Sequence, residues 1–171
     1  MGRGGPEHQY LQDLVKRWAE SNGYRAMVEE KILNGRGSVD VALRTDDFSI
    51  ACEISVTSTV GQEVGNVQKC LEAGFHEVAV LGLKRPRLTK IEAALKGKLP
   101  TADLARVHFL TPEELFTMLA MRPVTRETVV DGYKVRVRRV DIDPTEAAAR
   151  YRALTEVVAK SVRRMTGGGK P

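Results

Sequence analysis

The sequence predicts an α/β fold in which helices cover both faces of a mixed central sheet, forming a three-layer sandwich. Two observations support this fold class. Segments with helical spacing of apolar residues alternate with short apolar segments typical of strands, in the order α, β, β, β, α, β, α, β, α. The length of 171 residues suits one compact core, which buries roughly 70% of the surface of the unfolded chain.

The first part of this order is a helix followed by three strands. Apolar side chains recur at helical spacing through residues 7–22, and Gly23 suits the end of that helix. Strands are expected over residues 24–32, 39–44 and 49–56, with a glycine-bearing turn between the first two. We expect the last two of these strands to form a hairpin.

The rest of the core alternates helices with strands. A helix over residues 59–74 leads to a valine-rich strand over residues 77–83, which suits burial on both faces. A helix over residues 87–95, a strand over residues 107–110 and a helix that begins with the capping pattern Thr111-Pro112-Glu113-Glu114 complete the core.

The pattern changes after residue 122. A hairpin is expected around the Asp131-Gly132 turn, and a capping sequence at Asp143 predicts a final helix that ends near Met165. The expected organisation is a core of residues 1–122, a hairpin-plus-helix appendix of residues 123–165 and a disordered tail of residues 166–171.

The composition is that of an ordinary globular protein, with 42% apolar and 29% charged residues. The apolar runs are shorter than a membrane span and the N-terminus lacks a signal-peptide pattern, so we expect a cytoplasmic protein without a membrane partner. Cys52 and Cys70 have no metal-ligand spacing and are expected to be buried thiols. A small-molecule enzyme is disfavoured because no glycine-rich phosphate loop and no Ser/His/Asp arrangement follows any strand.

Two carboxylates interrupt otherwise apolar strands. Asp40 lies within Val39-Asp40-Val41, and Glu53 lies within Cys52-Glu53-Ile54. Burying an unpaired carboxylate costs several kcal/mol, so each acid needs a cation, a hydrogen-bond network or a metal. If the hairpin register brings the two acids side by side on one face, they form the hard-oxygen site that Mg²⁺ or Mn²⁺ prefers.

This arrangement resembles the PD-(D/E)XK nuclease superfamily, whose fold is restriction-endonuclease-like. The resemblance covers residues 7–110 and is carried by the helix, the glycine turn and the two acid-bearing strands. It implies that Asp40 and Glu53 hold one or two Mg²⁺ ions for phosphodiester hydrolysis. Residues 53–59 and 66–75 are also similar to nuclease-like domains appended to bacterial conjugation-type and DNA-translocating ATPases, which implies a DNA-processing machine with an ATPase partner.

The chain departs from the superfamily pattern at Ser55, where the motif has lysine. Lys69 is the candidate replacement, and it shares one helical face with Gln62 and Asn66. The alternative is that Lys69 is a solvated surface residue. The domain would then be a catalytically inactive DNA-binding or partner-docking module.

Other residues are candidates for supporting roles. Glu7 or His8 of the first helix could reach the site, but His8 lies on the apolar stripe, where a satisfied core-edge histidine is the commoner outcome. One of Glu29 and Glu30 could supply a third acid, since neighbouring strand residues point to opposite faces. The alternative for these glutamates is a solvated strand end.

A basic strip is expected on the hairpin. Lys134, Arg136 and Arg138 alternate along one strand, and the chain carries 27 basic against 22 acidic residues, a net charge of +5. The strip could contact DNA phosphates, or it could simply prevent aggregation at a strand edge. Aromatic residues make up only 5% of the chain, which argues against a base-stacking platform for single strands.

Overall fold

The protein is described from a computed structural model that covers residues 5–122, 124–130 and 133–139, with only the backbone described from residue 125 onward. The chain divides into two compact units, Met1–Arg139 and Val140–Pro171, and all the described residues belong to the first. The expected final helix and the tail of residues 166–171 lie outside the described residues.

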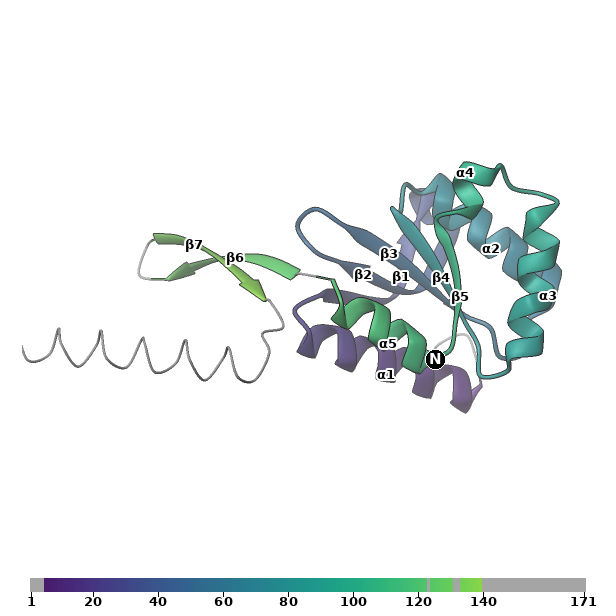
Figure 1. Cartoon of the computed structure of the whole chain (residues 1–171), viewed down its shortest axis with the longest axis horizontal. Coiled ribbons are helices and arrows are strands. Elements are labelled where there is room, and N and C mark those ends of the chain that lie inside the picture. Colours follow the sequence, from purple (N-terminus) through teal and green to yellow (C-terminus); the bar gives the residue numbers. More distant parts are fainter. Residues whose placement is uncertain (1–4, 123, 131–132, 140–171) are drawn as a thin grey trace, which may run out of the picture. The chain divides into compact units, whose positions relative to one another are not determined.

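The predicted order of helices and strands is confirmed (Figure 1). The elements are α1 (Pro6–Ser21), β1 (Arg25–Ile32), the short 3₁₀ turn η1 (Leu33–Gly35), β2 (Gly37–Arg44), β3 (Ser49–Ile54), α2 (Val60–Glu72), β4 (Glu77–Leu81), α3 (Arg85–Lys96), α4 (Thr101–Leu104), β5 (Val107–Leu110), α5 (Pro112–Ala120), β6 (Val124–Val130) and β7 (Tyr133–Arg139). The sequence pattern did not indicate α4, which has only four residues. Among these described elements no helix is long and apolar enough to span a membrane.

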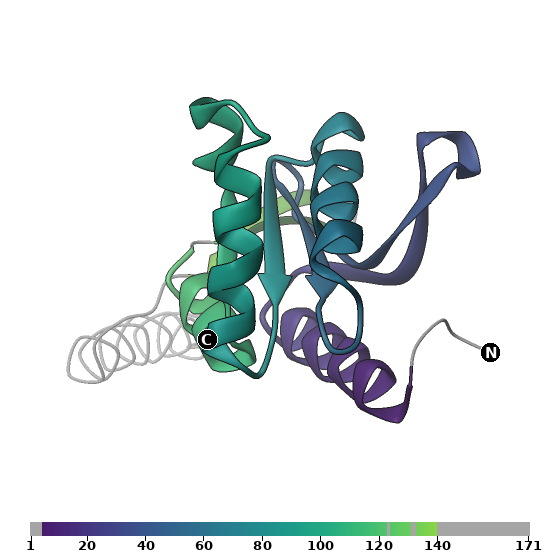
Figure 2. The ribbon, with the colours of Figure 1, turned by 90° about the vertical axis from the view of Figure 1, so that its right-hand side faces the viewer.

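Strands β1 to β5 form one mixed sheet in sequence order. β1, β2 and β3 are antiparallel neighbours, whereas β3, β4 and β5 run parallel. Helices α1 and α5 cover one face and α2 and α3 the other, as Figures 1 and 2 show. The α/β three-layer sandwich predicted from the sequence is therefore confirmed. Strands β6 and β7 form a separate antiparallel hairpin at the expected turn.

Each face of the sheet has its own hydrophobic core. Leu11 and Val15 of α1 pack with Leu115 of α5 against one face. Val67 of α2 and Ile91 of α3 pack against the other. Each of these five side chains is at least 95% buried, and each such burial stabilises the fold by roughly 1.5–3 kcal/mol. The helical spacing of the sequence therefore identified the packed faces correctly, and Cys52 and Cys70 are both buried thiols as expected.

Strand β3 ends at Ile54, two residues earlier than predicted, and the reason lies in the next turn. The Ser55 amide donates to the Leu81 carbonyl at the end of β4, after which the chain leaves the sheet. Thr59 then begins α2 with a capping box in which its hydroxyl accepts from the Gln62 amide and its own amide donates to the Gln62 side chain. The turn between β3 and α2 is thus fixed at both ends.

Strands β1 and β2 share an irregularity at one level. Glu29 adopts a φ of 53°, a conformation that is uncommon for a residue with a side chain. Val28 pairs with Val41 and Glu30 with Val39, but Glu29 and Asp40 between them form no ladder pair. Regular alternation would place Val39 and Val41 on one face, yet they belong to opposite cores. Asp40 therefore sits where the strand exchanges its faces.

Candidate functional site

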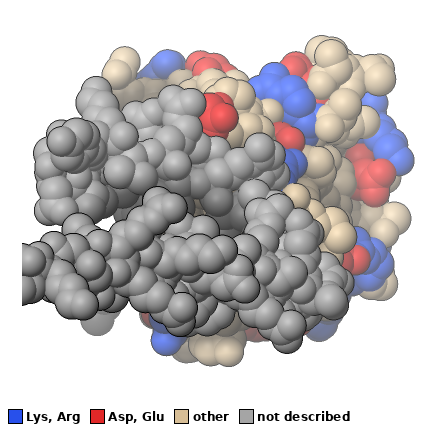
Figure 3. Space-filling view, turned by 60° about the vertical axis from the view of Figure 1, so that its left-hand side comes forward, with Lys and Arg blue, Asp and Glu red and all other residues tan. Residues whose placement is uncertain are grey.

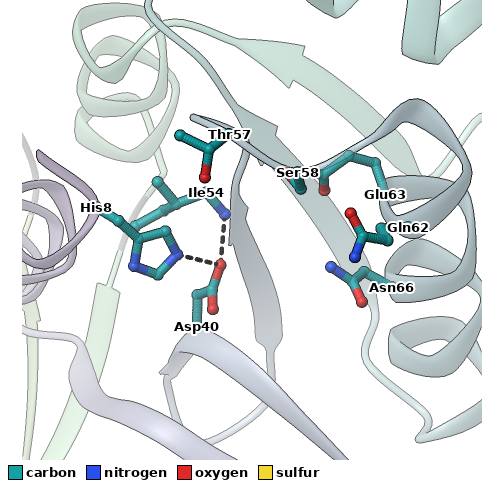
Figure 4. Close-up of a pocket in the computed structure, with 8 residues that line it drawn as sticks. All are labelled: His8, Asp40, Ile54, Thr57, Ser58, Gln62, Glu63 and Asn66. Atoms are coloured by element: carbon teal, nitrogen blue, oxygen red, sulfur yellow. Dashed lines mark hydrogen bonds and ion pairs between the residues drawn. The ribbon is translucent and has the colours of Figure 1, made fainter. Parts of the chain in front are cut away.

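A pocket of about 350 Å³ lies at the end of the sheet where the β2–β3 ladder stops. Figure 4 shows α1 and β2 contributing side chains from one side, and α2 contributing them from the other. The lining residues are His8, Asp40, Ile54, Thr57, Ser58, Gln62, Glu63 and Asn66. The pocket therefore collects four residues that the sequence singled out, His8, Asp40, Gln62 and Asn66, together with residues that it did not.

Asp40 is held in the pocket by two donors to the same oxygen. The ladder between β2 and β3 ends with Val41 opposite Cys52, so the Ile54 amide lies beyond it and donates to Asp40 Oδ2 at 2.8 Å. His8 Nε2 lies 3.1 Å from the same oxygen. This bond, followed by the Asp40 charge, raises the pKa of His8 above its ordinary value, although burial opposes the shift.

Glu53 has different surroundings. Its side chain is only 2% exposed, it does not line the pocket, and the Cys70 thiol of α2 donates to its Oε1 at 3.2 Å. Burial, and then the nearby charge of Asp40, raise the pKa of Glu53 to about 8. The two predicted acids are thus close enough to interact electrostatically, but only Asp40 reaches the pocket. Their sharing of one ion stays a prediction.

Glu63 is an acid that the sequence reasoning missed. It belongs to α2, is 1% exposed and lines the pocket. Its Oε1 accepts the Ser58 hydroxyl, whereas its buried Oε2 has no hydrogen-bond partner among the described residues. A local signal was present, because Glu63 lies three residues after Val60 and four before Val67, on the apolar stripe of the helix.

Arg87 supplies the cation beside Ser55. The Ser55 hydroxyl, where the superfamily motif has lysine, accepts from Arg87 Nε at 2.7 Å. The same guanidinium donates to the carbonyl oxygen of Ser58 and lies 3.3 Å from the Ser58 hydroxyl. Arg87 comes from α3, and no spacing in the sequence indicated that this helix would bring it to the turn after β3.

Lys69, the sequence candidate for this role, lies elsewhere on α2. It does not line the pocket, and its stem packs beside Gly37 and Ile32, since a methyl group added at Gly37 would lie 3.3 Å from Lys69 Cδ. Its charge lowers the pKa of Glu53, a smaller effect than the burial that raises it. Gln62 also has a structural task, because its side chain completes the cap of α2.

The two glutamates of β1 do not line the pocket. Glu30 forms an ion pair with Arg44 across the β1–β2 ladder. Glu29 lies close enough for its charge to favour protonation of His8. Of these two candidates for a third acid, Glu29 is therefore the one whose charge acts on a residue of the pocket.

The predicted basic strip lies on β7, of which the structure describes only the backbone. Lys134, Arg136 and Arg138 alternate along the strand, and Glu127 of β6 is the register partner of Arg136. On the described part of the surface that Figure 3 shows, basic and acidic side chains are interspersed. DNA contact by the strip stays a prediction.

The pocket contains oxygen atoms that could bind a metal ion, but its side chains are not arranged as a complete coordination shell. Among the described residues, no three His, Cys, Asp or Glu side chains are grouped so that they could hold an ion as they stand. The donor chemistry nevertheless fits Mg²⁺ or Mn²⁺, because Asp40, Glu63 and the Asn66 amide line one pocket, and the buried Oε2 of Glu63 has no hydrogen-bond partner among the described residues.

Comparisons of the chain with protein-family models, with curated proteins and with solved structures find no match. Membership of the PD-(D/E)XK superfamily therefore stays a prediction from the sequence pattern.

Proposed function

We propose that this chain is a metal-dependent deoxyribonuclease domain of the PD-(D/E)XK type, which hydrolyses DNA phosphodiester bonds within a DNA-processing or DNA-transfer machine. The observation that supports the proposal is the convergence of Asp40, His8 and Glu63 on one pocket at the end of the sheet. An ATPase or translocase as partner and a cytoplasmic location belong to the same proposal.

The residues of the pocket have distinct tasks in this proposal. Asp40 and a neighbouring glutamate would hold Mg²⁺, which when bound activates water and neutralises charge on the scissile phosphate. The Ile54 amide and His8 fix Asp40 Oδ2 and so set the direction of the carboxylate. Arg87, held by neutral oxygens of Ser55 and Ser58, places a positive charge at the turn beside the pocket.

A second candidate function is a catalytically inactive DNA-binding or partner-docking module on the same fold. The specific observation that favours it is the burial of Glu53, which bonds to Cys70 instead of facing the pocket. An acid that does not line the pocket is not placed to hold a metal ion there.

Metal-dependent cleavage separates the two functions. Wild type, Asp40→Asn and the matched control Asp13→Asn, which changes an exposed aspartate of α1, are incubated with single-stranded, duplex and branched DNA in Mg²⁺ or Mn²⁺. The nuclease proposal expects cleavage by wild type and the control, and its loss in Asp40→Asn. DNA binding without cleavage by wild type on every substrate would support the inactive module instead.

A further inference from the structure

The strongest unexplained feature of the pocket is the state of the Glu63 carboxylate. The residue is 1% exposed, and its Oε2 is buried without a hydrogen-bond partner among the described residues. A buried carboxylate oxygen without a partner costs several kcal/mol, so a protein rarely keeps one that nothing contacts. An acid whose second oxygen is unpaired, and which lines a pocket, is a candidate ligand for a cation in that pocket.

The surroundings of Glu63 fix its other oxygen. Arg87 donates to the Ser58 carbonyl and lies against the Ser58 hydroxyl, and that hydroxyl donates to Glu63 Oε1. This chain of contacts links α3, the turn after β3 and α2. It holds one carboxylate oxygen of Glu63 in place and leaves the second for another partner.

The remaining donors of the pocket are also oxygens. Asp40 receives the Ile54 amide and His8 on Oδ2 alone, so neither of these bonds uses its Oδ1. The amide of Asn66 and the hydroxyl of Thr57 line the same pocket. Two carboxylates with neutral oxygen donors form the set that a hard divalent cation prefers.

Glu53 is less suited to this role. It lies outside the pocket lining, is 2% exposed and receives the Cys70 thiol on Oε1. A cation in the pocket therefore has Glu63, and not Glu53, among the side chains that line its surroundings.

We propose that a divalent cation binds in this pocket between Asp40 and Glu63, with Glu63 of α2 acting as the second acidic ligand instead of Glu53 of β3. The inference rests on the proposed function for its choice of ion. Its test measures binding and does not depend on DNA cleavage.

The experiment is a titration of the full chain with Mn²⁺. Binding is monitored by calorimetry and by the electron paramagnetic resonance signal of free Mn²⁺. The variants are Glu63→Gln, Asp40→Asn, Glu53→Gln and the exposed control Glu113→Gln. We expect one site in wild type, a dissociation constant about tenfold or more weaker in Glu63→Gln and Asp40→Asn, and values near wild type in Glu53→Gln and Glu113→Gln.

A measurement on wild type guards against a variant that fails to fold. Bound Mn²⁺ should broaden the amide resonances of Thr57 and Asn66 before those of Glu113, which lies on α5. Absence of wild-type binding, preferential broadening away from the pocket, or loss of binding in Glu53→Gln with wild-type affinity in Glu63→Gln would each overturn the inference.

Parallel DNA-cleavage assays keep the two proposals apart. Cleavage by wild type together with wild-type Mn²⁺ affinity in Glu63→Gln leaves the nuclease proposal standing and removes this inference. The expected binding pattern without cleavage on any DNA supports this inference and counts against the nuclease.

Discussion

Replacing Glu53 with glutamine should change how the stability of the protein depends on pH. The folded protein keeps a proton on Glu53 up to a pH of about 8, because burial and then the Asp40 charge raise its pKa from the ordinary 4.5. The unfolded chain releases that proton near pH 4.5. Between these values the folded state binds more protons, so the free energy of unfolding of wild type falls as the pH rises.

The magnitude follows from the size of the shift. The difference between about 8 and 4.5 is about 3.5 pKa units, which at about 1.4 kcal/mol per unit sets an upper bound of roughly 5 kcal/mol. Glutamine has nearly the same shape and can still accept the Cys70 thiol, but it carries no charge at any pH. Glu53→Gln should therefore match wild type near pH 5 and become increasingly more stable than wild type toward pH 8.5.

Urea denaturation at pH 5, 6, 7, 8 and 8.5 in the presence of a chelator measures this effect. The raised pKa of His8 acts in the same direction, since stability present below its unfolded value is lost as the pH rises through its folded value. His8 is present in all the proteins compared, so the difference between wild type and Glu53→Gln isolates Glu53. The exposed control Glu113→Gln should follow wild type, and stability profiles of wild type and Glu53→Gln that stay parallel would refute the reasoning.

Three further predictions concern the cation beside the pocket, its histidine and the hairpin. Arg87→Gln should lower the free energy of unfolding, measured by urea denaturation, by about 2–4 kcal/mol, because it removes charge-assisted bonds to the turn after β3. Arg87→Lys should recover part of this loss, and an Arg87→Gln variant as stable as wild type would contradict the role of these bonds. In an NMR titration the pKa of His8 should lie above 6.5 in wild type and fall in Asp40→Asn, and a His8 pKa that does not respond would show that Asp40 is not its partner. Replacing Arg136 and Arg138 with alanine should weaken DNA binding and reduce the slope of its salt dependence by about one for each phosphate that is no longer neutralised, whereas an unchanged salt titration would assign both residues to solubility.

Local patterns were enough to predict the elements of the fold. The spacing of apolar residues identified the packed faces of α1 and α2, and the cap of α5 at Thr111 was predicted and is confirmed. Such signals depend on neighbours within a few residues, which a single sequence displays completely. The early end of β3 was not predictable in this way, because it depends on where the ladder with β4 stops, and the last pair of that ladder joins Ile54 to Leu81, 27 residues further along the chain.

The pocket was only partly predictable for the same reason. Asp40 was visible as a charge within an apolar strand, and it lines the pocket. Glu63 gave a comparable signal on the apolar stripe of α2, but the superfamily pattern points to acids on strands and not on this helix. Arg87 gave none, since its place beside Ser55 depends on how α3 packs across the sheet. The place of Asp40 is likewise unpredictable from alternation, because β2 exchanges its faces there, opposite the irregular backbone of Glu29.

That irregularity also bears on how the molecule unfolds. On one side of it the β1–β2 hairpin contributes Ile32 and Val39 to the core under α2 and α3, and on the other it contributes Leu43 to the core under α1 and α5. A single hairpin therefore carries apolar side chains of both layers. Detaching this hairpin from the sheet therefore removes packing from both cores at once. We expect one cooperative transition for this sheet and its helices, in which the most protected amides of the two layers exchange with the same free energy of opening.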